Sequence, residues 1–188
     1  MIFRLFRPTP SDPIIAMLYG TIVAQARAPA FYRQYRVPDT VNGRLEMIML
    51  HAVLLLWRLE QGAEPLPALG QAVFDRFCAD MDESMREMGI GDLAVPRKMR
   101  RVGEAFYGRQ AAYRAALAAD GAELGAALER NVFAGAVEPA GAAWLAAYAR
   151  AAASQLAAQD GFERGEVAFP DPAQVPSPPQ PAATAVAP

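Results

Sequence analysis

Residues 80–109, DMDESMREMGIGDLAVPRKMRRVGEAFYGR, combine the end of one helix, a glycine-containing turn and the start of a second helix. Large apolar residues recur at helical spacing on both sides of the turn. Gly89 follows the first helix at the position where glycine commonly ends a helix in a left-handed conformation. Pro96 stands in the first turn of the second helix, where its missing N–H costs nothing. The stretch predicts two neighbouring antiparallel helices, over residues 68–88 and 96–119.

Charged side chains gather on both helices of this stretch. Asp80, Glu83 and Glu87 have the spacing i, i+3, i+7 and form one acidic stripe, in which like charges repel and oppose the helix macrodipole. The second helix carries a basic flank of Lys98, Arg101 and Arg109, with Arg97 and Arg100 nearby. Two interpretations fit: an ion-paired seam between the helices, or a bipolar docking surface for a partner. The charge pattern alone favours the seam.

The rest of the sequence predicts further helices and no strand. The expected helical ranges are about 11–27, 40–61, 122–133 and 139–159, with a short aromatic segment at 31–35 between the first two. Range 40–61 is apolar nearly all round in its middle, which is typical of the buried centre of a bundle. We therefore expect an all-α, single-domain bundle of about six helices.

The two ends of the chain differ from this helical region. We assign residues 1–10 to an N-terminal extension, 11–160 to the helical domain and 161–188 to a disordered tail. Seven of the sixteen prolines lie in residues 170–188, and such a composition cannot bury enough apolar surface to fold. The longest apolar run, 47–57, is shorter than the roughly 20 residues that cross a bilayer, so we predict no transmembrane span.

Composition excludes several classes of function. The formal charge of -2 at pH 7 gives no overall attraction to nucleic acid or to an anionic membrane. The chain has one cysteine, Cys78, and one histidine, His51. A single cysteine cannot form an internal disulfide framework or a cysteine zinc site, and these two residues do not supply a classical catalytic triad. Leu54 and Leu55 stand where a second metal ligand would follow His51 on a helix, so we expect a structural histidine. We predict a non-enzyme, without cofactor or metal.

Short motifs occur in order along the chain. The first group is Leu18-Tyr19-Gly20, Gln25-Ala26-Arg27, Phe31-Tyr32, Val37-Pro38-Asp39-Thr40, Gly43-Arg44 and Leu50-His51. The second group is Asp80-Met81-Asp82, Arg86-Glu87-Met88-Gly89, Gly91-Asp92 and Phe106-Tyr107-Gly108-Arg109, followed by Tyr113. Together they resemble the ubiquinol–cytochrome c chaperone family over residues 12–150.

The resemblance implies a non-enzymatic assembly factor for ubiquinol–cytochrome c reductase, respiratory complex III, with newly made cytochrome b as its client. Mitochondrial members act near the ribosomal tunnel exit with a small partner protein, so the ribosome and such a partner are further candidate contacts. The chain is similar to bacterial-type members, because it shows no evident transit peptide. We expect a cytoplasmic protein, peripheral to the inner membrane on the side equivalent to the mitochondrial matrix, and no contact with DNA.

The resemblance also places the residues that bind the client or a partner in the stretch 80–109. The candidates are Asp80, Asp82, Glu83, Arg86, Glu87, Asp92, Lys98, Arg101, Tyr107 and Arg109. The acidic residues would meet basic loops of a membrane client, and methionine and aromatic side chains would meet its apolar segments. Tyr107 and Arg109 would add an aromatic platform and a fixed cation.

Two other functions fit the sequence. A quinone-binding enzyme or carrier would use the methionine and aromatic interior of the bundle, and it predicts a lined cavity with a polar head-group site near His51 or Tyr113. A ribosome-associated factor would use residues 97–101 as a short basic patch for ribosomal RNA. A packed interior argues against the first function, and salt-insensitive or absent ribosome binding argues against the second.

Overall fold

The computed structural model describes residues 11–119, 122–134 and 139–176, and within these ranges the chain is helical, without β-strands. The helices are α1 (Asp12–Ala26), α2 (Pro29–Arg33), α3 (Val41–Glu60), α4 (Leu66–Glu87), α5 (Val95–Ala118), α6 (Glu123–Asn131) and α7 (Pro139–Ala157), followed by a 3-10 turn, η1 (Phe162–Arg164). The predicted all-α bundle is confirmed. The longer helices begin and end within a few residues of the predicted ranges.

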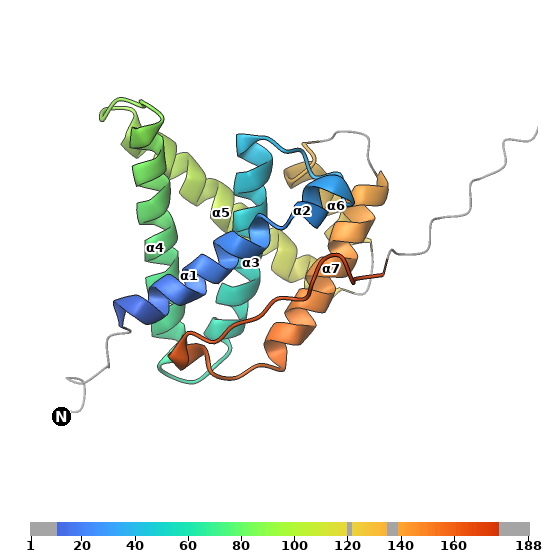
Figure 1. Cartoon of the computed structure of the whole chain (residues 1–188). Helices are drawn as coiled ribbons and strands as arrows, with labels where there is room; N and C mark the ends of the chain where they lie inside the picture. Colours follow the sequence, from blue (N-terminus) through green and yellow to red (C-terminus); the bar gives the residue numbers. More distant parts are fainter. Residues whose placement is uncertain (1–10, 120–121, 135–138, 177–188) are drawn as a thin grey trace, which may run out of the picture.

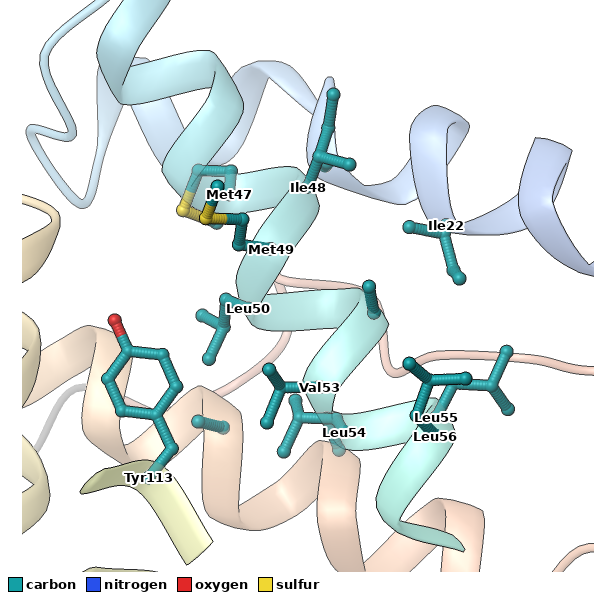
Figure 2. Close-up of a cluster of buried hydrophobic side chains, with 14 of the residues drawn as sticks. Ile22, Met47, Ile48, Met49, Leu50, Val53, Leu54, Leu55, Leu56 and Tyr113 are labelled. Carbon is teal, nitrogen blue, oxygen red and sulfur yellow. The ribbon is translucent and has the colours of Figure 1, made fainter. Parts of the chain in front are cut away.

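Helix α3 is the centre of the bundle, and α1, α4, α5 and α7 all pack against it (Figure 1). Every residue from 46 to 56 is buried, so the helix has no solvent-facing side over this length. Figure 2 shows its apolar side chains pointing in several directions, with Ile22 of α1 and Tyr113 of α5 lying on different sides of it. The apolar middle of the predicted range 40–61 is therefore the core, as expected.

The start of α3 is fixed by contacts within a few residues. The Thr40 hydroxyl accepts a hydrogen bond of 3.0 Å from the backbone N–H of Gly43, which caps the helix. Arg44 Nε donates to Asp39 Oδ1 at 2.7 Å. A Cβ atom on Gly43 would lie 2.0 Å from the Pro38 carbonyl oxygen, so only glycine permits this close approach. The motif residues of this region thus build the turn that leads into α3.

Helices α4 and α5 form the predicted antiparallel pair. Gly89 ends α4 with φ +77°, as the sequence predicts. The buried residues of α4 all lie at or before Phe77, and the distal half of the helix extends beyond α1 to one corner of the molecule (Figure 1). The helical spacing of apolar residues on α4 continues to Met88 and would place it in the core, but Met88 is 59% exposed. The apolar face of α4 continues past the helices that cover it.

Residues 161–176 correct the predicted start of the disordered tail at Gly161. They leave α7 through η1 and follow an extended path between α1 and α7 (Figure 1). Phe162 and Pro172 are buried against the bundle. Composition measures what a segment can bury by itself, whereas here the bundle supplies both apolar surface and hydrogen-bond donors. The N-terminal extension, 1–10, and the rest of the predicted tail, 177–188, lie outside the described residues.

One stretch, Asp12–Arg33, is long and apolar enough to cross a membrane by length and composition alone. The prediction of no transmembrane span was based on residues 47–57, which lie outside this stretch. In the structure this stretch is two helices, α1 and α2, and α1 packs against α3 and α4. Only 28% of its apolar window is buried in the bundle, and length and composition do not by themselves assign or exclude a membrane span.

Candidate functional site

The turn between α4 and α5 is held by one arginine. Arg86 Nε donates to Asp82 Oδ2 at 2.7 Å within α4, and Arg86 Nη1 bonds Asp92 across the turn. All three side chains are well exposed to solvent, where an ion pair contributes about 0–1 kcal/mol. Asp82, Arg86 and Asp92 therefore contribute to the shape of the turn. Their charges are paired with one another inside the chain.

Asp80 belongs to the packing of α1 on α4. The Tyr19 hydroxyl donates to Asp80 Oδ2 at 2.7 Å. Burial first, and then the hydrogen bond to Asp80, raise the pKa of Tyr19 well above its usual value. The hydroxyl consequently keeps its proton at physiological pH and remains a donor to Asp80.

Arg109 is paired inside the bundle. Its Nε and Nη2 atoms donate to the two carboxylate oxygens of Glu46, at 2.6 and 2.5 Å. The Glu46 side chain is 3% exposed and that of Arg109 is 20% exposed, and the hydrogen bond to Glu46 raises the pKa of Arg109. This two-point pair joins α5 to α3, so Arg109 is not the solvent-facing cation that the sequence analysis expected.

Glu83 and Glu87 face solvent and have no ion pair within the described ranges. Lys98 and Arg101 are exposed in the same way on α5. The predicted seam between the two helices does not form. The acidic stripe and the basic flank do not face each other. The stripe begins at Asp80, on the side of α4 that faces α1, whereas the basic flank ends at Arg109, on the side of α5 that faces α3.

Tyr107 lies at the edge of a surface hollow of about 130 Å³ between α3, α4 and α5. The residue is 59% exposed, and its ring centroid is 5.7 Å from that of Phe74. Phe106 forms part of the same wall, and Glu60 and Gln71 stand among the polar lining groups. The lining of the hollow thus mixes aromatic rings with polar side chains.

His51 is fully buried and both of its ring nitrogens are used. Nδ1 lies 2.7 Å from the Met47 carbonyl oxygen, which can only accept, so this nitrogen carries the proton. Nε2 then accepts from the Tyr148 hydroxyl at 2.8 Å. Burial lowers the pKa of His51 to about 4. His51 therefore has no free polar atom for a quinone head group, and the described residues contain no group of three or more possible metal ligands.

Comparison with known proteins agrees with the sequence motifs. The model of the family "Ubiquinol-cytochrome C chaperone" matches residues 33–169. The chain belongs to this family. The crystal structure of the Cbp3 homolog from Brucella abortus is 40% identical in sequence, with a TM-score of 0.82, and the match covers 94% of this chain and 100% of that one.

A second relative is the ubiquinol-cytochrome-c reductase complex assembly factor 1 of Xenopus laevis. It is 25% identical over 115 residues, which are 61% of this chain and 58% of the relative. The chain thus aligns with little more than half of that protein. The predicted resemblance to the chaperone family is confirmed, but over a different span: the match begins at Arg33 rather than at residue 12 and extends beyond residue 150 to Phe169.

The structure divides the ten candidate residues of this chaperone-family chain into two groups. The residues with partners inside the chain are Asp80, Asp82, Arg86, Asp92 and Arg109. The residues whose side chains face solvent without a hydrogen bond or ion pair among the described residues are Glu83, Glu87, Lys98, Arg101 and Tyr107. We call this second group the hairpin surface, and it is the part of the predicted site that remains available to a partner.

Several residues with important contacts were not singled out by the sequence analysis. The role of Glu46 could have been predicted, because a single carboxylate within an apolar run needs a buried partner. The side chains that bind residues 168–176 were others, namely Gln25, Tyr35 and Trp144. Gln25 belongs to a motif and Tyr35 to the aromatic segment, but no local pattern shows what these three bind, because their partners lie more than thirty residues away along the chain.

Proposed function

We propose that this member of the chaperone family binds newly made cytochrome b and supports its assembly into ubiquinol–cytochrome c reductase. The family description supports a chaperone, and the name of the Xenopus relative supports complex III assembly. We choose the client-binding surface from one observation, made at the end of the α4–α5 pair. There, charges without internal partners stand beside exposed apolar side chains, Met88 at 59% and Leu93 at 99% exposure.

This combination suits a membrane client. An unassembled membrane protein presents apolar helices, and its cytoplasmic loops carry an excess of Lys and Arg. Glu83 and Glu87 can pair with such basic loops, while Met88 and Leu93 contact apolar surface. Methionine adapts to irregular surfaces, and exposed ion pairs are worth only about 0–1 kcal/mol each. Because each of these contacts is weak and non-covalent, the protein can hold a client and release it again without a covalent reaction.

We further propose that the protein acts in the bacterial cytoplasm at the surface of the inner membrane. This location follows from the family resemblance, and the Brucella relative adds only that a bacterial protein shares the fold. The exposed basic side chains of Arg97, Lys98 and Arg101 support a weak contact with ribosomal RNA near the site of client synthesis. If so, ribosome binding should weaken steeply as salt increases, because phosphate contacts release counterions.

The test is a deletion strain complemented with variants. Deletion should remove assembled complex III, and the wild-type chain should restore it. The double substitution Glu83→Lys/Glu87→Lys should fail to restore it, whereas the matched control Glu123→Lys/Glu163→Lys, which makes the same charge change at other exposed positions, should succeed. Normal complex III in the deletion strain would contradict the proposed function.

A further inference from the structure

Residues 168–176, which we call the strap, are held by side-chain donors from three separate parts of the bundle. Gln25 Nε2 of α1 donates to the Pro170 carbonyl at 2.8 Å. The hydroxyl of Tyr35, after α2, donates to the Pro172 carbonyl at 2.8 Å. Trp144 Nε1 of α7 donates to the Val175 carbonyl at 3.2 Å. The bundle thus binds the main chain of the strap at three points.

A fourth contact fixes the beginning of the strap. The Gln159 side chain accepts from the Ala168 N–H at 2.8 Å and donates to its carbonyl at 2.7 Å. Gln155 Nε2 donates to the same carbonyl at 3.1 Å. One amide side chain therefore pairs with both polar backbone groups of Ala168, as a neighbouring strand would.

The surface under the strap is aromatic. Tyr35 and Trp144 are stacked with their ring centroids 4.8 Å apart, and Pro172 is buried against the bundle. Phe169 sets its ring edge-on to His51, with centroids 5.0 Å apart. We call the surface formed by Gln25, Tyr35, His51, Trp144 and Tyr148 the groove.

The chemistry of the groove matches proline. Pro170 and Pro172 have no N–H, so each needs only a donor for its carbonyl, and Gln25 and Tyr35 supply those donors. Aromatic grooves with tyrosine or tryptophan donors are a recurrent way to recognise extended, proline-containing segments, which lose little entropy on binding. A residue with an N–H at the buried position of Pro172 would need a further acceptor there.

The strap is attached to the bundle as a ligand is, without a shared helix or strand. Its outer side, including Asp171 and Gln174, is exposed to solvent. The Asp171 carboxylate accepts from the Ala173 N–H at 2.9 Å, so part of the bound shape is formed within the strap itself. Glycines with positive φ, Gly161 and Gly165, stand in the connection from α7.

We propose that the groove is a recognition site for an extended Phe-Pro-x-Pro segment, which the strap occupies in cis and a partner protein carrying the same pattern occupies in trans. A tethered segment has a high effective concentration, so the strap excludes weak ligands until a competitor is abundant or the strap is released. The groove lies between α1 and α7, away from the turn between α4 and α5 (Figure 1). This inference is independent of the cytochrome b proposal.

The test uses a fluorescent peptide with the sequence of residues 166–176, EVAFPDPAQVP, and full-length protein. The wild-type chain should bind it weakly, and the strap variant Phe169→Ala/Pro172→Ala should bind it about tenfold or more tightly, because the cis competitor is weakened. Adding Tyr35→Phe to the strap variant should weaken binding by roughly 5- to 10-fold, the loss expected for one hydrogen bond. A peptide with alanine at both proline positions should bind less well than the original.

A second measurement uses the wild-type chain, so the test does not depend on the strap variant being folded. A large excess of unlabelled peptide should increase hydrogen exchange at the amide of Ala168, which donates to the Gln159 side chain, and leave those of α3 protected. Unchanged exchange, or peptide binding that ignores Tyr35→Phe, would overturn the proposal. A concentration-dependent dimer that exchanges straps would assign the groove to a second copy of the chain and would also overturn it.

Discussion

The carboxylate of Glu46 is held in the interior of the bundle by the two-point contact with Arg109. Replacing Arg109 with methionine keeps most of the side-chain volume but leaves this carboxylate without its cation. We expect Arg109→Met to lower the free energy of unfolding by about 3 kcal/mol, the cost of breaking a buried ion pair. Urea unfolding followed by circular dichroism measures this change.

The matched control is the double substitution Glu46→Met/Arg109→Met. It removes both charges, so it should recover most of the lost stability, because an apolar pair of similar volume often replaces a buried ion pair without cost. If Arg109→Met unfolds at the same urea concentration as the wild type, the pair does not stabilise the bundle.

His51 gives the stability of the protein a defined pH dependence. Its pKa is about 4 in the folded chain and about 6.5 in an unfolded chain. Between these values the unfolded state binds one more proton than the folded state, so stability falls as the pH decreases from 6.5 to 4. The full loss is about 3 kcal/mol, and stability is unaffected by this group above pH 6.5.

The measurement is the difference in unfolding free energy between the wild type and His51→Gln at a series of pH values. Glutamine does not titrate, so the variant should lack this part of the pH dependence while keeping that of the carboxylates. Parallel pH profiles for the two proteins would show that His51 is not the buried neutral group described above.

Residue-level features were predictable where their causes are local. The left-handed Gly89 and the capping Thr40 follow from neighbours a few positions away, and both are found in the structure. The partner of Arg109 lies 63 positions away, and helical periodicity shows only the side of α5 that Arg109 occupies. The sequence alone therefore could not distinguish an internal ion pair from a docking cation.

At the scale of elements, one glycine sets how closely α7 approaches the end of α2. A Cβ atom on Gly141 would lie 2.4 Å from the Tyr35 carbonyl oxygen and 3.0 Å from the Phe133 ring. Gly141→Ala should therefore shift α7 and destabilise the protein by about 1–3 kcal/mol, as overpacking does. Thermal and urea unfolding report the change.

Gly20 in α1 is the control for this substitution. A Cβ atom there has nothing within 4 Å, so Gly20→Ala should stabilise the helix by about 0.5–1 kcal/mol through its better helix propensity. Equal effects of the two substitutions would mean that α7 has room to accept a methyl group at Gly141.

The charges at the end of α4 should be nearly neutral for stability. Glu83 and Glu87 have no ion pair among the described residues and stand near a helix C-terminus, where negative charge is unfavourable by about 0.3–1 kcal/mol. The unfolding free energy of Glu83→Lys/Glu87→Lys should stay unchanged or rise by a few tenths of a kcal/mol. A loss above about 1 kcal/mol would reveal an internal seam.

The elements themselves were largely predictable, and the strap was not. Helical spacing, proline and glycine placed the helix ends within a few residues. Segment 161–176 has the composition of a disordered chain, but it is bound by Gln25, Tyr35 and Trp144 from distant parts of the sequence. A rule based on composition considers only the surface that a segment can bury by itself. It cannot predict burial against surface that other elements provide.

For the whole molecule, the arrangement around α3 separates the interior contacts that stabilise the bundle from the surfaces that a partner can reach. The core, the Glu46–Arg109 pair and the His51 network fix the bundle. The hairpin surface and the hollow beside Tyr107 remain open to a partner, and the groove is closed by the strap. Membership of the chaperone family places these surfaces in a protein whose proposed task is to hold a client rather than to transform it.

The most direct test of the central claim is an affinity purification of the tagged protein from its native membranes, with mass spectrometry of the bound proteins. We predict that cytochrome b is enriched with the wild type and with Glu123→Lys/Glu163→Lys, and that it is depleted with Glu83→Lys/Glu87→Lys. Recovery of other proteins without cytochrome b, from membranes that are making complex III, would contradict the account.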